Sequence, residues 1–224
     1  TKGGTNEFEG SVGYYDRGDQ FYGDKIEGNK YTFDKEDTAQ SFTFGGPIIK
    51  DKAFFYVTYE DTTVTNPVLY GPAGSGAANE QAITMEQVDS LRQLTISKYG
   101  WDPLGVASTT ESKQENTSLR IDYILNENHR LTYNYKNTEG DRLRASGSNS
   151  SFYFESASYF KGEKTDTSSI LLVSDWSDNL ISEVYYSNKS TDTSQESPAG
   201  QNVPNFYIDD AYGMRVYLGA DIYR

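Results

Sequence analysis

The sequence predicts an all-β fold, a segment of an antiparallel transmembrane β-barrel, and three observations lead to this prediction. Segments of roughly ten residues alternate between apolar and polar positions, as the strands of membrane barrels do. Only 35% of the residues are hydrophobic, yet 14% are aromatic and 19 are tyrosines. Membrane barrels place aromatic residues at both lipid–water interfaces and keep a polar interior. Long and short links between the segments also alternate, as extracellular loops and periplasmic turns do.

The composition excludes several other classes of protein. The net charge of −13 would repel a phosphate backbone, so a nucleic-acid partner is not expected. With no cysteine and one histidine, disulfide scaffolds and thiolate or histidine metal centres are excluded. No apolar run is long enough for a membrane-spanning helix. No catalytic constellation is found, so we expect neither an enzyme nor a cofactor.

The first predicted strand covers residues 5–16. Phe8, Gly10, Val12 and Tyr14 share one face of it, and Glu7, Glu9, Ser11 and Gly13 take the other. A polar stretch rich in Asp, Gly and Lys follows, which predicts a loop.

The second and third predicted strands form a tight hairpin. Residues 40–49 end at Lys50-Asp51, and the aromatic run Phe54-Phe55-Tyr56 begins almost at once within 53–59. A two-residue junction between two strands is typical of a hairpin.

One helix is predicted, over residues 85–98 in the next long link. Thr84 and Gln87 fit a capping box, and Gly100 marks the end of the helix. Its apolar face either caps the rim of the barrel or contributes to a ligand-binding surface.

The clearest hairpin joins residues 118–123 to residues 130–136. Each segment carries apolar or aromatic side chains on one face and polar or charged ones on the other. An Arg or Lys facing lipid at the midplane costs about 2–4 kcal/mol, so the charged face is assigned to the lumen. Predicted lipid-facing residues are Leu119, Ile121, Tyr123, Leu131, Tyr133 and Tyr135; predicted lumen-facing residues are Arg120, Asp122, Arg130, Thr132, Asn134 and Lys136.

Two further strands, 166–176 and 180–189, are joined by a short turn, and a last short strand is predicted at Met214–Leu218. Because the short links follow the second, fourth and sixth strands, the first strand must run outward from the periplasm. The extracellular loops are then 17–39, 66–112, 141–164 and 190–213.

Several stretches resemble TonB-dependent outer-membrane receptors of the Oar-like branch. Residues 1–8 with Gly10-Ser11 are similar to the junction where the plug ends and the first barrel strand begins. The run Gly-Gly-Pro-Ile-Ile-Lys-Asp-Lys at 45–52, preceded by Phe44 and followed by Phe54-Phe55, is the most specific. Weaker resemblances lie at Tyr59-Glu60, 98–103, 128–131 and 218–224.

The resemblance implies a barrel of about 22 strands with a plugged lumen, of which this chain supplies seven or eight. Residues 1–4 would be the junction between plug and barrel, with the plug, its coupling box and the other strands outside this chain. A ligand, not identified by the sequence, would bind at the cell surface and pass to the periplasm with energy from the inner-membrane TonB-type complex. The expected partners are outer-membrane lipid, the rest of the barrel, the plug, that complex and the ligand.

Two alternatives stay open. The chain could instead be an acidic, β-rich surface protein with an adhesive or structural role and no part in transport. Loop carboxylates such as Asp16, Asp19 and Asp24 could bind calcium, although their spacing matches no complete loop motif and a solvated surface is favoured.

Overall fold

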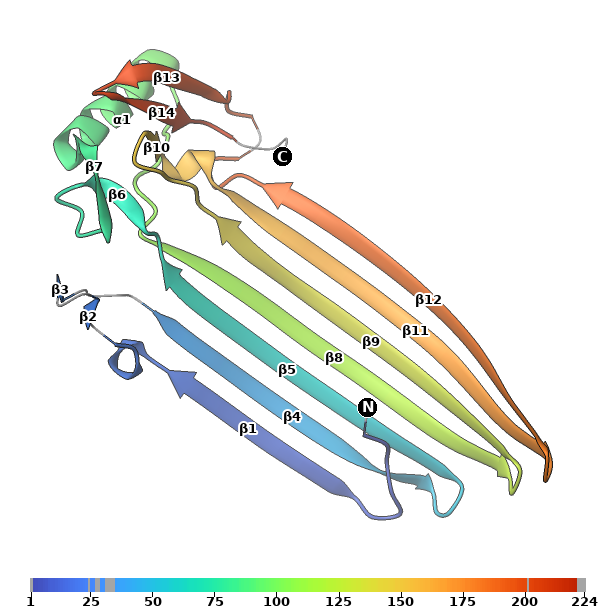
Figure 1. Cartoon of the computed structure of the whole chain (residues 1–224). Helices are drawn as coiled ribbons and strands as arrows, with labels where there is room; N and C mark the ends of the chain where they lie inside the picture. Colours follow the sequence, from blue (N-terminus) through green and yellow to red (C-terminus); the bar gives the residue numbers. More distant parts are fainter. Residues whose placement is uncertain (1, 24, 27–28, 31–34, 201, 221–224) are drawn as a thin grey trace.

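The structure, a computed structural model, describes residues 2–23, 25–26, 29–30, 35–200 and 202–220. Its main element is a seven-stranded antiparallel sheet in which every strand pairs with its neighbours along the chain (Figure 1). The strands of this sheet are, in spatial order, β1 (Glu9–Arg17), β4 (Glu36–Ile49), β5 (Ala53–Pro67), β8 (Thr109–Asn126), β9 (His129–Arg144), β11 (Tyr159–Ser177) and β12 (Leu180–Glu196).

The short and long links lie at opposite ends of the sheet (Figure 1). Tight turns join β4 to β5, β8 to β9 and β11 to β12, and the long links all emerge at the other end. Among the described residues, no helix is long and apolar enough to span a membrane. The all-β, antiparallel fold class predicted from the sequence is confirmed.

Six of the seven strands are longer than predicted, whereas β1 begins at Glu9, so residues 5–8 of the first predicted strand are not part of it. From β4 to β12 they have 14 to 19 residues, and they extend into segments predicted as loops. The sequence signal stops early because the extensions are polar on both faces, so the alternation of apolar and polar residues that identifies a strand is lost. The links after β1, β5 and β9 therefore shorten to residues 18–35, 68–108 and 145–158.

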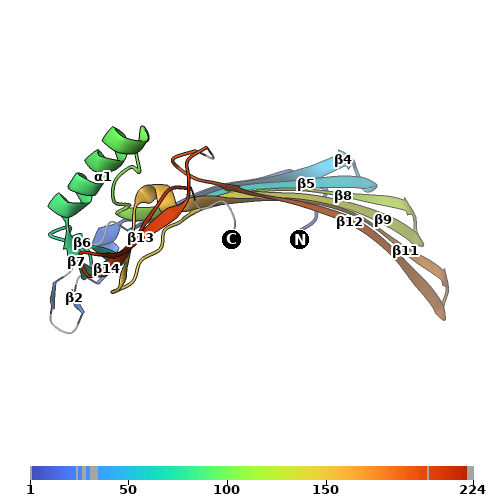
Figure 2. The ribbon, with the colours of Figure 1, turned by 90° about the horizontal axis from the view of Figure 1, so that it is seen from above.

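The sheet is curved, and the beginning of the chain lies on its concave side (Figure 2). The strands form an arc when seen from above. Curvature of this kind is what a strongly twisted sheet needs in order to close into a barrel. Since β1 and β12 are the first and last strands, each keeps one unpaired edge within the described residues.

Three of the long links fold together at the loop end into one packed unit, here called the loop cap and comprising the described parts of residues 68–108, 145–158 and 197–220. Its elements are β6 (Tyr70–Ala73), β7 (Asn79–Thr84), α1 (Met85–Tyr99), β10 (Ser151–Tyr153), η2 (Glu155–Ala157), β13 (Phe206–Ala211) and β14 (Met214–Leu218). The first link carries only η1 (Asp19–Phe21), β2 (Lys25–Ile26) and β3 (Asn29–Lys30) among its described residues.

The strand predicted at Met214–Leu218 forms, as β14, but does not add an eighth strand to the main sheet. It pairs in parallel with β10 and antiparallel with β13. Val216 and Leu218 of β14 are buried in the loop cap, and this apolar contact holds the strand there rather than beside β12.

The predicted helix is present as α1, with the predicted cap. The Thr84 hydroxyl accepts a hydrogen bond from the Gln87 backbone N–H at 3.3 Å, and Gln87 Oε1 accepts one from the Thr84 N–H at 2.9 Å. Val88 is buried in the core of the loop cap. The helix therefore packs on the rest of the loop cap through the apolar face seen in the sequence.

Removal of this cap gives a small, local effect. Thr84→Ala is expected to weaken α1 by about 1 kcal/mol, because the Gln87 backbone N–H of the first turn loses its acceptor, the Thr84 hydroxyl. Hydrogen exchange at Glu86 and Gln87 should accelerate about fivefold, since that free energy is a factor of about five. Ser97→Ala, at the exposed far end of the helix, is the control and should leave those amides unchanged; unchanged exchange in Thr84→Ala as well would contradict the assignment.

Candidate functional site

The strand register sorts the twelve predicted site residues onto the two faces of the sheet. Leu119 lies opposite Tyr135, and Ile121 opposite Tyr133, so these side chains share a face. Arg120 lies opposite Asn134 on the other face. The remaining six, Tyr123, Leu131, Asp122, Thr132, Arg130 and Lys136, follow the same division. We call the two surfaces the apolar face and the polar face.

The apolar face continues across all seven strands and lies open to its surroundings. Val12 at one edge of the sheet is 84% exposed and Val184 at the other is 60% exposed, and a continuous exposed apolar surface of this kind is unusual for a protein that meets only water. Cross-strand pairing places the following residues on this face together with the six predicted ones: Val12, Tyr14, Phe42, Phe44, Phe55, Val57, Tyr59, Ile170, Leu172, Val184 and Tyr186.

The apolar band ends abruptly toward the loops. Its last residues on β1, β5, β9 and β12 are all tyrosines, namely Tyr14, Tyr59, Tyr135 and Tyr186. The next position on the same face is polar on every strand: Asp16, Gln40, Asp61, Thr117, Asn137, Ser168 and Asn188. Tyrosines at the border between an apolar and a polar surface are typical of a membrane interface.

This border runs diagonally across the strands. The cross-strand pairing relates each of these tyrosines to a position on β5, where Tyr59 is the reference. Tyr14 is level with a residue two positions nearer the loops than Tyr59. Tyr135 is level with a residue two positions farther from the loops than Tyr59, and Tyr186 with one four positions farther. The border thus shifts by six residues, roughly 20 Å of strand, over six strand spacings, roughly 29 Å. If the border lies parallel to the membrane plane, the strands are tilted by about 35° from the membrane normal, which is within the range of outer-membrane barrels.

The polar face carries a buried carboxylate in its turn half. Asp122 is 0% exposed and accepts hydrogen bonds from Arg120 Nε at 2.7 Å and Arg120 Nη2 at 3.0 Å. Arg130 Nη2 lies at 3.1 Å and the Thr132 hydroxyl at 2.8 Å. A buried charge is tolerated when it is paired and hydrogen-bonded in this way. Four of the six predicted lumen-facing residues are thus one bonded cluster.

The segment before β1 lies across this cluster on the concave side. A Cβ on Gly3 would be 3.0 Å from Asp122 Oδ2, and a Cβ on Gly4 would be 2.3 Å from the Phe55 carbonyl oxygen. Only glycine allows the backbone to approach the sheet so closely at Gly4. The polar face is therefore the concave face, and it already carries a piece of chain against its wall.

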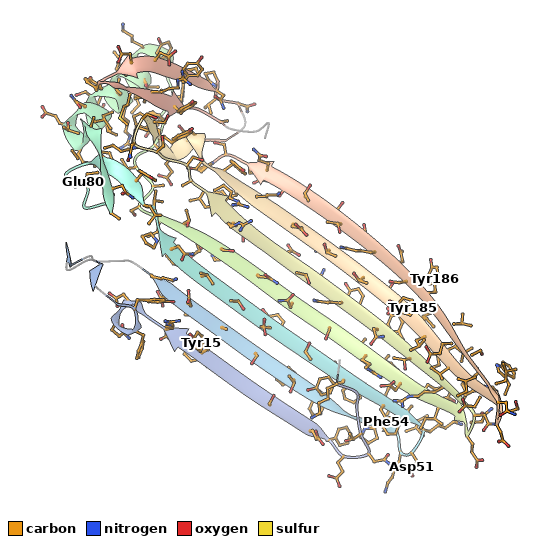
Figure 3. The ribbon with its side chains drawn as sticks, in the orientation of Figure 1. Tyr15, Asp51, Phe54, Glu80, Tyr185 and Tyr186 are labelled. Carbon is orange, nitrogen blue, oxygen red and sulfur yellow. The ribbon has the colours of Figure 1, made fainter. Side chains whose placement is uncertain are left out.

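The same segment is fastened to the turn end of the sheet. Lys2 Nζ lies 2.7 Å from Glu9 Oε2, and Asn6 exchanges two hydrogen bonds with Asp51, at 2.5 and 2.8 Å, in the turn between β4 and β5. Asp51 and Phe54 mark this end in Figure 3. These contacts fix the direction in which the chain enters β1.

The loop cap is held together by its own apolar core and by one buried serine. Ile83, Val88, Phe152, Phe154, Met214, Val216 and Leu218 form the core and come from three separate links. Ser156 donates its backbone N–H to the Pro103 carbonyl at 3.2 Å, and its own carbonyl accepts from the Ser197 hydroxyl at 2.9 Å. Its hydroxyl accepts from the Gly219 N–H at 3.0 Å. Ser156 therefore joins all three links.

Two carboxylates stabilise the part of the cap formed by residues 68–108. Asp102 forms a bidentate pair with Arg92 at 2.8 and 2.7 Å and accepts the Leu104 N–H at 2.8 Å; these bonds, the one from Arg92 foremost, lower the pKa of Asp102 below its usual value. The Glu80 carboxylate accepts the N–H groups of Gly74 and Gly76 and closes the turn after β6 (Figure 3). These bonds fix the turn after β6 and the segment that follows α1.

Other predicted features are not brought together. Asp16 and Asp19 stand near the start of the first link, and Asp24 lies outside the described residues. In the part of the chain that the structure describes, no group of three or more carboxylates and histidine is arranged to hold a metal ion. Residues 1 and 221–224 of the resembling stretches also lie outside the described residues.

The comparisons with known proteins agree with this geometry. Residues 1–75 match the family model described as "Outer membrane beta barrel domain", a stretch that contains β1, β4, β5 and their connections. No curated protein and no solved structure matches the chain. The chain is an outer-membrane protein, and its sheet is a segment of an antiparallel β-barrel.

Proposed function

We propose that this chain is part of the barrel of a TonB-dependent outer-membrane transporter or receptor, of the Oar-like kind that its sequence resembles. Such a protein binds a ligand at the cell surface and passes it to the periplasm with energy from the inner membrane. In this proposal the apolar face contacts lipid, the polar face lines the lumen, and the loop cap is the part that first meets the ligand.

The observation that carries the proposal is the path of residues 2–8. The chain crosses the concave wall at Gly3 and Gly4 before it turns into β1, which is where a domain inside the lumen would connect to the first strand. The alternative, a surface protein without a lumenal domain, gives no reason for a chain docked against this wall. The coupling to the TonB-type complex would run through a plug that precedes this segment.

The alternative is an acidic adhesive or structural protein of the cell surface. It gains some support from the loop cap, which is a packed unit with its own apolar core. Under this alternative the polar face needs no plug and the protein needs no energy-coupling partner.

The test is a binding assay on the full-length protein, purified in detergent from outer membranes, with the periplasmic domain of the TonB protein. Specific capture that is lost when the segment preceding β1 is deleted supports transport. A full-length protein that folds, resides in the outer membrane and never captures that domain contradicts transport and favours the surface protein.

The orientation of the two faces is tested separately. Ile121→Arg is expected to lower the free energy of unfolding by about 2–4 kcal/mol in lipid vesicles, because it places a charge in the hydrocarbon. The matched control is Ser187→Arg, which adds the same side chain to the polar face. Cross-strand pairing places Ser187 level with Arg120, the residue next to Ile121. This control should change the free energy of unfolding by less than about 1 kcal/mol. Urea unfolding measures both; equal losses would contradict the assignment of the faces.

A further inference from the structure

The polar face carries a second feature, nearer the loops than the Asp122 cluster. A depression of about 370 Å³ lies over β8, β9 and β11. Its side chains on the polar face are Ser112, Gln114, Thr138, Arg142, Lys161 and Glu163. Gly140 forms its floor: a Cβ there would come within 2.8 Å of the Lys113 carbonyl oxygen. The hollow exists because this position has no side chain.

Two cations stand at its loop-side edge in an unfavourable arrangement. Arg142 and Lys161 are directly opposite each other on neighbouring strands, and like charges in this position destabilise a sheet. Both are exposed, and neither forms an ion pair among the described residues. Arg144 follows two residues later on the same face of β9.

The charge around the depression does not explain this pair. The protein has a net charge of −13, and carboxylates at this level lie mainly on the other face, as Glu115, Glu139 and Asp192 do around a separate depression. Glu163 is the one carboxylate that the polar face contributes among the residues lining the hollow. A repulsive cation pair beside a hollow, in an acidic protein, is expected where an anion is to be bound.

We infer that the Gly140 depression binds a small oxyanion, the carboxylate or phosphate group of a ligand, between Arg142 and Lys161. The guanidinium fork of Arg142 suits two oxygens of such a group, Lys161 adds a second positive charge, and Ser112 and Gln114 supply neutral donors. The place of the site on the path of a transported ligand rests on the proposed function. The binding of the anion does not.

Equilibrium dialysis of the full-length protein in detergent tests the site, with labelled inorganic phosphate and labelled malonate as probes at constant ionic strength in chloride. We expect saturable binding of at least one probe, and a loss of affinity of tenfold or more in the double variant Arg142→Gln, Lys161→Gln. Binding of phosphate alone indicates a phosphorylated ligand, and binding of malonate alone a carboxylate; binding of both supports a general oxyanion site.

The matched control is Lys189→Gln, on the same face of β12 opposite Thr167. It removes one exposed cation without touching the depression and should leave binding unchanged. Since the double variant relieves a like-charge contact, it should unfold at the same or a higher urea concentration than the natural protein. No binding to the natural protein, or equal binding to the double variant, would overturn the inference. Anion binding by a protein that fails to capture TonB would leave this site standing and refute transport alone.

Discussion

Arg120→Leu is expected to lower the free energy of unfolding of the barrel by about 3 kcal/mol or more, because it leaves a charged carboxylate buried. Asp122 is fully buried and loses two of its four hydrogen bonds in this variant. Arg130→Leu removes one bond to the same carboxylate, from a side chain that is 53% exposed rather than 24%. A more exposed pair contributes less, so this matched variant should cost about 1 kcal/mol.

The cause of that loss is tested with a double variant. If the lost charge pairing at Asp122 is responsible, adding Asp122→Asn to Arg120→Leu should recover part of the stability, because a neutral amide costs less to bury than a carboxylate. Urea unfolding in lipid vesicles of the natural protein, Arg120→Leu, Asp122→Asn and the double variant gives the four values of the cycle. Strictly additive losses would mean that Arg120 acts through packing, and would refute the charge argument.

The two faces of the central hairpin could be predicted because the information is local. Residues such as Ile121 and Arg120 alternate along one strand, and a period of two fixes their faces wherever the strand lies. The tyrosine border is less local. Tyr59 and Tyr135 are recognised as one line only when the register between their strands is known.

The loop cap could not be predicted because its core is assembled from distant segments. Ile83, Phe152 and Val216 belong to three different links, and outside α1 none of those links has an apolar periodicity long enough to predict a packed face. Only α1 carried a strong local signal, through its capping box. The sequence thus indicates that the links are long, but not that they pack on one another.

The docking of the first residues was also beyond the sequence. From the sequence, Gly3 and Gly4 are assigned only to the junction before the first strand, whereas in the structure their small size allows close contact with Asp122 and with the Phe55 backbone. The hollow over Gly140 is a similar case. The absence of a side chain gains meaning only when the neighbouring strands are in place.

Phe154→Ala is expected to destabilise the loop cap by about 3–5 kcal/mol while the strands stay folded. Phe154 is 0% exposed, its ring lies 5.1 Å from that of Phe152, and its N–H donates to the Tyr217 carbonyl at 3.0 Å. Truncation leaves a cavity among side chains from three links. Because the core of the cap contains no residue of the seven barrel strands, the damage should stay local.

Hydrogen exchange resolves the two parts of the molecule. Amides of β10, α1 and β14 should exchange at least a hundredfold faster in Phe154→Ala, a factor that corresponds to about 2.7 kcal/mol, while those of β8 and β9 keep their protection. Phe21→Ala, which removes a ring that is 65% exposed, is the control and should leave both parts unchanged. If β8 and β9 lost protection together with the cap, the cap would be part of the barrel's cooperative unit. The opposite result means that the cap can open while the barrel wall stays folded.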